Sequence, residues 1–230
     1  MSQPIIDPNT KAVAFDAVGT VLYPEPSVSA AYASVATRHG SELTEQDIRS
    51  RFGPAMAVFD DDSQANDFRT NESQERLLWE QVVTRVLTDV DDVTSCFDEL
   101  WEWFGRPEAW RVFDDVAETL EALRSRGLSI AIASNFDHRL HAVCEGLPEV
   151  ATISKRVVSS EVGYRKPSAG YYNRLAEVCG VLPQQVLMVG DTPTNDIEGA
   201  RAVGMRAVLV DRSRDADLPD RVSSLKQILS

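Results

Sequence analysis

From about residue 111 onward, short apolar runs alternate with amphipathic helical stretches, and this rhythm restricts the chain to few folds. Helical spacing fills the intervals, as over 169–179 and 196–203. Residues 12–16 supply one more buried strand. The other expected strands are 128–134, 156–160, 185–191 and 206–211. Such alternation indicates an α/β fold with a central parallel sheet and helices on both faces.

The rhythm is interrupted after the first strand, where about 80 residues show helical spacing and no strand pattern. Thr44–Asp47 has the pattern of a capping box and predicts a short helix that ends at Gly53. The other expected helices are 27–39, about 72–88 and 92–104. We therefore predict an α/β core, residues 1–23 plus 106–230, and an all-helical insert, residues 24–105.

Charge and cysteine usage limit the partners and the compartment. The net charge of −13 argues against nucleic acid and anionic membranes, which require basic surfaces, but not against a small anion. No apolar run is long enough to span a bilayer, and the three cysteines show no metal-binding spacing. We expect a cytoplasmic protein, either a monomer or a homodimer.

Carboxylates collect where the predicted strands end, which is where parallel sheets bind ligands. Asp16 ends the first strand, Asp191 ends a later one, and Asp196 follows in the next loop. Lys166 lies in the loop GYRKP. Because three carboxylates repel one another, we expect a hard divalent cation among them, and Mg²⁺ with oxygen ligands fits.

Hydrogen-bond donors suited to phosphate oxygens are expected at the same edge of the sheet. They are the Gly19 and Thr20 backbone amides, the Ser134–Asn135 strand end and the Lys166 ammonium. The predicted site thus joins Mg²⁺ to a small phosphorylated metabolite.

Four segments, in order, resemble the signatures of the haloacid dehalogenase-like hydrolases: FDAVGTV, IASN, RKP and VGDTPTNDIEGARAVG. The helical insert resembles the cap of that family. The resemblance implies a Rossmann-like three-layer core with a mobile cap that closes over the site.

The resemblance also implies roles for individual residues. Asp16 would be the nucleophile that forms an aspartyl intermediate. Ser134 and Lys166 would hold the transferring group, and Thr20 would orient the loop. The expected Mg²⁺ ligands are Asp16, the Val18 backbone carbonyl, Asp191 and Asp196.

Val18 departs from the family's phosphatases, which have a second aspartate two positions after the nucleophile. That aspartate protonates the leaving group and activates water, and losing such a group costs roughly 10²–10⁴-fold in rate. His138, His141, Tyr23 and Glu25 are candidates to replace it.

Two branches of the family lack the second aspartate. Dehalogenases have tyrosine there and need no metal, so the sequence GDTPTND and Val18 argue against that activity. Phosphonatases need a cap lysine, and the chain has no lysine between Lys11 and Lys155. The prediction is a Mg²⁺-dependent hydrolase of phosphorylated metabolites; the alternative is a regulatory homologue that binds phosphate and metal without turnover.

Overall fold

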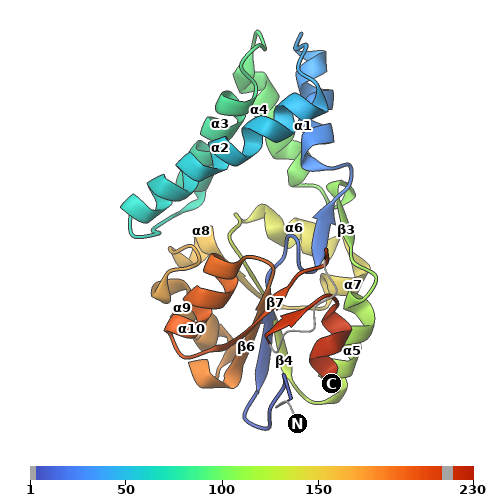
Figure 1. The fold of residues 1–230 in the computed structure, drawn as a ribbon, viewed down its shortest axis with the longest axis vertical. Coiled ribbons are helices and arrows are strands. Elements are labelled where there is room, and N and C mark those ends of the chain that lie inside the picture. The colour runs from blue at the N-terminus through green and yellow to red at the C-terminus, as the bar shows by residue number, and fades with distance from the viewer. Residues whose placement is uncertain (1–3, 214–219) are drawn as a thin grey trace.

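A computed structural model describes residues 4–213 and 220–230, except for the side chains of residues 59–63. A sheet-centred part and a helical part lie end to end (Figure 1). The main sheet has the strand order β5-β4-β1-β6-β7-β8, and every pairing is parallel. Its strands are β1 (Ala12–Phe15), β4 (Ser129–Ser134), β5 (Lys155–Val158), β6 (Val186–Gly190), β7 (Arg206–Val210) and β8 (Arg221–Val222). The predicted α/β fold with a parallel sheet is confirmed.

Alternate side chains of the strands face two separate apolar cores, as the pleat of a strand requires. Val13 and Phe15 pack with α5 (Val116–Ser125), while Ala14 packs with α9 (Ala169–Cys179) on the other face. Both faces of the sheet are therefore covered, which gives the three layers expected from the apolar runs.

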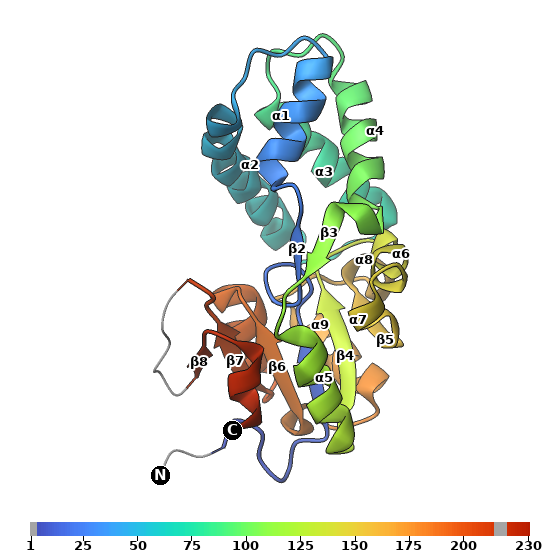
Figure 2. The same cartoon turned by 90° about the vertical axis from the view of Figure 1, so that its right-hand side faces the viewer.

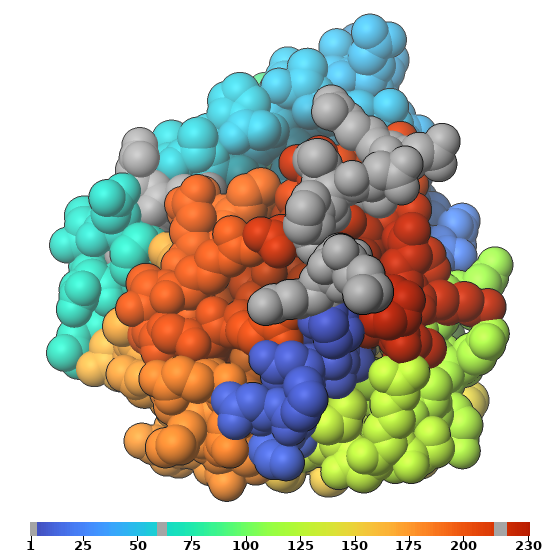
Figure 3. Space-filling view, turned by 60° about the horizontal axis from the view of Figure 1, so that its bottom comes forward, coloured from blue at the N-terminus to red at the C-terminus, as the bar shows by residue number. Residues whose placement is uncertain are grey.

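Strand β1 lies in the middle of the sheet. The Lys11 amide donates to the Gln185 carbonyl over 2.8 Å, and the Lys11 carbonyl accepts from the Ser129 amide over 3.0 Å. The N-terminal segment accordingly emerges between later parts of the chain, as the dark blue atoms of Figure 3 show. The carboxyl end of β1 is thus flanked by the ends of β4 and β6.

Two predicted boundaries in the core are wrong. Residues 159 and 160 were expected to end a strand, but Val158 pairs with Ser134, the last residue of β4, and α8 (Ser159–Val162) follows at once. The helix expected from residue 196 begins earlier, as a π-helix over Pro193–Glu198 continued by α10 (Gly199–Ala202). The remaining helices of the core are α6 (Arg139–Glu145), α7 (Pro148–Ala151) and short 3₁₀ turns at Pro107–Ala109, Pro183–Gln185 and Leu225–Leu229.

Between β1 and α5 the described chain forms four longer helices around their own apolar core. They are α1 (Val28–Arg38), α2 (Glu45–Ala65), α3 (Glu72–Val86) and α4 (Val93–Phe104). Side-chain oxygens of Ser27, Asn71 and Asp92 cap α1, α3 and α4. None of the described helices is both long enough and apolar enough to cross a lipid bilayer.

Helix α2 does not end at Gly53 as predicted, but continues through Gly53 and Pro54. Its apolar stripe explains this, because Ile48, Ala55 and Met56 all pack in the core of the insert. Tertiary packing here outweighs the low helix propensity of glycine and proline.

A two-stranded antiparallel sheet joins the two parts (Figure 2). Strand β2 (Leu22–Pro24) pairs with β3 (Trp110–Val112), with Leu22 opposite Val112. The apolar pattern did not predict strands of three residues. The predicted boundary between core and insert at residues 23/24 falls within β2, and the one at 105/106 falls shortly before β3. The division into core and insert stays a prediction.

Candidate active site

Three carboxylates converge at the carboxyl end of the sheet. Asp16 follows β1, Asp191 follows the neighbouring β6, and Asp196 lies in the π-helix after it. One ligand oxygen from each side chain lies within 4.8 Å of the others. Distant segments meet because β1 and β6 are hydrogen-bonded neighbours.

The ammonium of Lys166 sits against two of these carboxylates. Its Nζ lies 2.6 Å from Oδ1 of Asp16 and 2.6 Å from Oδ1 of Asp196, and it also donates to the Ala133 carbonyl over 3.0 Å. The Lys166 side chain is only 3 % exposed. The ion-paired lysine is thus held inside the protein rather than in solvent.

The side-chain amide of Asn135 positions the backbone of Lys166. Its Oδ1 accepts from the Lys166 amide over 2.7 Å, and its Nδ2 donates to the Lys166 carbonyl over 3.0 Å. The loop after β4 therefore fixes the loop that carries the lysine.

Glycine at positions 19 and 190 permits the carboxylates to approach. Gly19 has φ of +88°, and a Cβ there would lie 2.7 Å from Cγ of Asp191. A Cβ at Gly190 would collide with the side chain of Asp196. Both glycines leave space that the carboxylates occupy.

Electrostatics at the site favour a cation. Burial raises the pKa of Asp16 most, Lys166 opposes the rise, and the neighbouring Asp196 and Asp191 add to it, so that the pKa lies at about 7. Desolvation and Asp196 also raise the pKa of Asp191. Burial alone would lower the pKa of Lys166, but Asp16 and Asp196 outweigh it and raise that pKa well above its usual range. The ammonium therefore stays charged.

The donor set fits a hard divalent cation. When ionised, the four side chains carry three negative charges and one positive charge, so two negative charges are left uncompensated. Mg²⁺ takes oxygen ligands and is commonly held by one or two carboxylates together with substrate phosphate. Asp16, Asp191 and Asp196 are the residues that would hold it.

Hydrogen bonds to Leu22 and Arg212 hold the loop after Asp16 in place. The Gly19 amide donates to the Leu22 carbonyl over 2.7 Å. The Thr20 hydroxyl is fully buried and has no hydrogen-bond partner among the described residues, while the Thr20 carbonyl accepts from Nη2 of Arg212 over 2.7 Å. Arg212 in turn pairs with Asp115 through two contacts of 3.0 Å.

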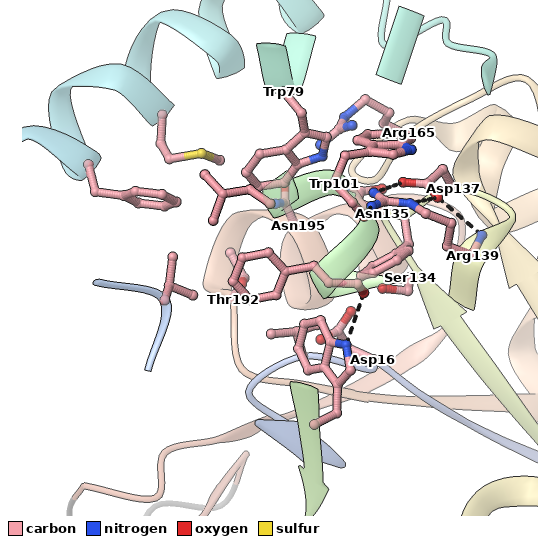
Figure 4. A pocket seen from close by; sticks show the side chains of 18 of the residues that line it. Asp16, Trp79, Trp101, Ser134, Asn135, Asp137, Arg139, Arg165, Thr192 and Asn195 are labelled. Carbon is pink, nitrogen blue, oxygen red and sulfur yellow. Dashed lines mark hydrogen bonds and ion pairs between the residues drawn. The ribbon is translucent and has the colours of Figure 1, made fainter. Parts of the chain in front are cut away.

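A cavity of about 380 Å³ opens above the carboxylates. In Figure 4, Asp16 and Ser134 lie at one end of it and Trp79 at the other. Val18 and Lys166 also line it, and all four helices of the insert contribute apolar side chains. The site is therefore shared between the sheet edge and the insert.

Comparison with known proteins decides the family. The sequence profile of the haloacid dehalogenase-like hydrolases matches residues 10–204, most of the chain. The chain belongs to the haloacid dehalogenase-like hydrolases.

Similar proteins of this family include a phosphatase. The chain is 28% identical to haloacid dehalogenase-like hydrolase domain-containing protein 3 of Mus musculus, covering 94% of this chain and 88% of that protein. It is 28% identical to ribulose-1,5-bisphosphate 5-phosphatase of Halopiger xanaduensis, covering 94% and 92%. The crystal structure of a HAD phosphatase from Thermococcus onnurineus superimposes with a TM-score of 0.65 at 25% identity, covering 95% and 96%. The family and its phosphatase members point to hydrolase chemistry.

None of the four candidates to replace the missing aspartate lines the cavity. Nδ1 of His138 lies 2.6 Å from Oε2 of Glu72, and Nε2 of His141 lies 2.9 Å from Oε1 of Glu161. The Tyr23 ring packs against the Phe113 ring at an angle of 43°, and the backbone amide of Glu25 donates to the Ala109 carbonyl. The side chains of His138, His141 and Tyr23 therefore contact other residues, and that of Glu25 is exposed.

Two buried ion pairs beside the site were not found by sequence reasoning. Asp137 accepts from Nε and Nη2 of Arg139 over 2.6 Å each. Nη1 of Arg165 lies 2.5 Å from both carboxylate oxygens of Glu75, which is fully buried. The spacing of Asp137 and Arg139 in the loop after IASN was the only local signal; Glu75 and Arg165 are 90 positions apart.

Proposed function

We propose that this hydrolase cleaves a small phosphorylated metabolite with Mg²⁺ through an aspartyl-phosphate on Asp16. The observation that carries the proposal is the convergence of Asp16, Asp191, Asp196 and Lys166 at one edge of the sheet. The cavity beside Asp16 supplies room for a substrate.

In the first step a carboxylate oxygen of Asp16 attacks phosphorus. The bond from phosphorus to the substrate oxygen breaks, and that oxygen keeps the electron pair. Lys166, already 2.6 Å from Asp16, would stabilise the negative charge on the phosphoryl oxygens, and Ser134 would donate to one of them. The Thr20 amide and Asn135 complete the proposed phosphate site. The predicted Gly19 amide does not belong to it, because it already donates to the Leu22 carbonyl.

In the second step water attacks the phosphorus of the intermediate. The bond to Asp16 breaks, one proton of the water stays on the released phosphate, and the other goes to solvent. Asp16 returns to its carboxylate form. The metal would be held by Asp16, Asp191, Asp196 and the Val18 carbonyl; when bound, it offsets the charge that develops on the phosphoryl group.

Val18 restricts the substrates that this site can cleave. Its hydrocarbon side chain lines the cavity but cannot protonate a leaving oxygen. Leaving groups that are stable as anions, such as those of aryl and acyl phosphates, need no such proton. We propose these as the favoured substrates.

The helical insert is proposed to act as a cap, with boundaries at residues 24 and 105. Its four helices line the cavity opposite Asp16, so substrate would enter when the insert moves away from the sheet edge. The β2–β3 ribbon is the proposed hinge.

The test is phosphate release from p-nitrophenyl phosphate and acetyl phosphate, with Mg²⁺ and with a chelator. We expect turnover only with Mg²⁺, and a loss of about 10⁴-fold or more in Asp16→Asn, which cannot form the intermediate. Mass spectrometry after an acid quench should find one phosphate on the wild-type chain. Steady turnover without that adduct would contradict the covalent step.

Val18 also favours a second candidate function, a module that binds phosphate and Mg²⁺ without turnover. It predicts Mg²⁺-dependent thermal stabilisation by phosphate and no hydrolysis across a broad panel of phosphate esters. A 2-haloacid assay without metal, included in that panel, checks for dehalogenation.

A further inference from the structure

The cavity extends well beyond the space that a phosphoryl group needs. Its volume of about 380 Å³ lies within the range of about 300–1,000 Å³ typical of pockets for small organic ligands. The end away from Asp16 is lined by side chains from all four helices of the insert, among them Phe52, Met56, Trp79, Val83, Phe97 and Leu100. We call this end the apolar chamber.

The two guanidinium groups that line the cavity are already matched by carboxylates of the protein. Arg139 makes two bonds of 2.6 Å to Asp137, which is 1 % exposed, and also stacks on the Trp101 ring. Arg165 faces both oxygens of Glu75. These pairs supply no surplus positive charge for a second anionic group of a ligand.

A ligand carboxylate or second phosphate in the chamber would therefore be removed from water without a matching charge, which is costly. An apolar group, in contrast, gains from burial against aromatic and aliphatic walls. The name of the Halopiger xanaduensis relative indicates a substrate with two phosphates. In this chain the second phosphate of such a substrate would lie against these apolar walls, which disfavours it.

We infer that the substrate carries an uncharged, apolar group of aromatic or alkyl character in the chamber; this rests on the proposed function. The inference agrees with Val18, because both point to phosphates of apolar aryl or acyl groups. The substrate class is thus a phosphorylated compound with one anionic end and one apolar end.

Calorimetric titration with phosphonates tests the chamber independently of turnover. The probes are methyl-, ethyl-, propyl- and butylphosphonate, with Mg²⁺ present, on the wild-type chain. We expect Kd to fall about 4-fold for each added methylene. 3-Phosphonopropionate, with the same number of carbons as propylphosphonate but a carboxylate at its end, should bind at least about 10-fold more weakly than propylphosphonate. A Kd that does not change along the series, equal binding of the matched pair, or no binding at all overturns the inference.

A positive charge placed in the chamber wall should reverse the preference for propylphosphonate over 3-phosphonopropionate. Met56→Lys puts an ammonium among the lining side chains, while the matched control Ala57→Lys adds the same charge at the next, exposed position of α2. We expect Met56→Lys to weaken the binding of propylphosphonate about 10-fold and to strengthen the binding of 3-phosphonopropionate. In the control variant the Kd of each phosphonate should stay within twofold of the wild-type value. If Met56→Lys does not fold, Met56→Ser replaces it, with weaker propylphosphonate binding expected. Unchanged binding in the folded variant contradicts the inference.

Hydrolysis of phenyl phosphate is measured in parallel, so that the two proposals fail separately. A rising affinity along the phosphonate series without turnover would reject the hydrolase and retain the chamber. If acetyl phosphate is hydrolysed, but phenyl phosphate is hydrolysed no faster and the phosphonates bind no more tightly along the series, the hydrolase is retained and the chamber is rejected.

Discussion

Nη1 of Arg165 lies 2.5 Å from both carboxylate oxygens of Glu75, so the residue next to Lys166 is bound to helix α3 of the insert. The contact is deeply buried, and Thr70 donates a further hydrogen bond of 2.8 Å to Glu75. The Arg165 amide also donates to the Phe68 carbonyl over 2.8 Å. The insert is therefore attached to the core through this contact as well as through the β2–β3 ribbon.

Glu75→Gln should destabilise the protein by about 3 kcal/mol, because it removes the buried charge that faces the Arg165 guanidinium. Urea denaturation measures the free energy of unfolding. Glu80→Gln, on the same helix and with no side-chain partner among the described residues, is the control and should change the stability by less than about 0.5 kcal/mol. Equal stabilities of the two variants would contradict the structural role of the pair.

Asp115 should contribute stability that depends on pH. Burial alone would raise its pKa, but hydrogen bonds from Arg212, Ser224 and the Leu225 amide outweigh this and lower the pKa below its usual value. The stability that the ionised Asp115 contributes is then complete at pH values above the unfolded-state pKa of about 3.9. It is lost as the pH falls through the lower pKa of the folded state.

Asp115→Asn should accordingly cost about 2 kcal/mol at pH 7. The gap in unfolding free energy between wild type and variant should stay constant from pH 7 to about 5 and narrow below about 4. Denaturation at several pH values checks this, with the exposed neighbour Asp114→Asn as control. If the difference in unfolding free energy widens on acidification, the pKa of Asp115 is not lowered in the folded state.

Gly19→Ala tests the close approach of the first loop to Asp191. A Cβ at residue 19 would collide with the Asp191 carboxylate, and φ of +88° adds backbone strain. Gly127→Ala is the matched control, since its φ of +73° imposes similar strain of about 1 kcal/mol with nothing within 4 Å of the new Cβ. We expect both variants to lose stability, but only Gly19→Ala to weaken the thermal stabilisation by Mg²⁺. Equal Mg²⁺ responses would remove Asp191 from the proposed metal site.

Periodicity predicted the fold because the strands of this sheet are buried on both faces and read as apolar runs. The position of Asp16 and Asp191 at one edge followed from the parallel topology, in which carboxyl ends meet. Lys166 lies beyond α8, so the topology alone did not place it there. The sequence did not predict where α2 ends, because that depends on how Ala55 and Met56 pack against other helices.

The partners of the charged residues could not be predicted either. Nothing near Glu75 in the sequence indicates Arg165, and Asp115 meets Arg212 only because the C-terminal part packs beside α5. Long-range ion pairs have no local pattern. For the same reason His138 was a reasonable candidate in sequence, although the fold turns it toward Glu72 of the insert.

Val18→Asp tests whether the missing proton donor is what limits the proposed hydrolase. Val18 lies two residues after Asp16 and lines the same cavity, so an aspartate there would face the leaving oxygen. We expect kcat/KM for alkyl phosphates to rise by about 10²-fold or more, and that for acetyl phosphate to change little, since only alkoxide leaving groups need the proton. Val18→Asn introduces a side chain of the same shape as aspartate but without an acidic proton, and so controls for polarity. An equal gain in both variants would assign the effect to hydrogen bonding rather than to proton transfer, and no gain in either would mean that Val18 is not what limits alkyl phosphate hydrolysis.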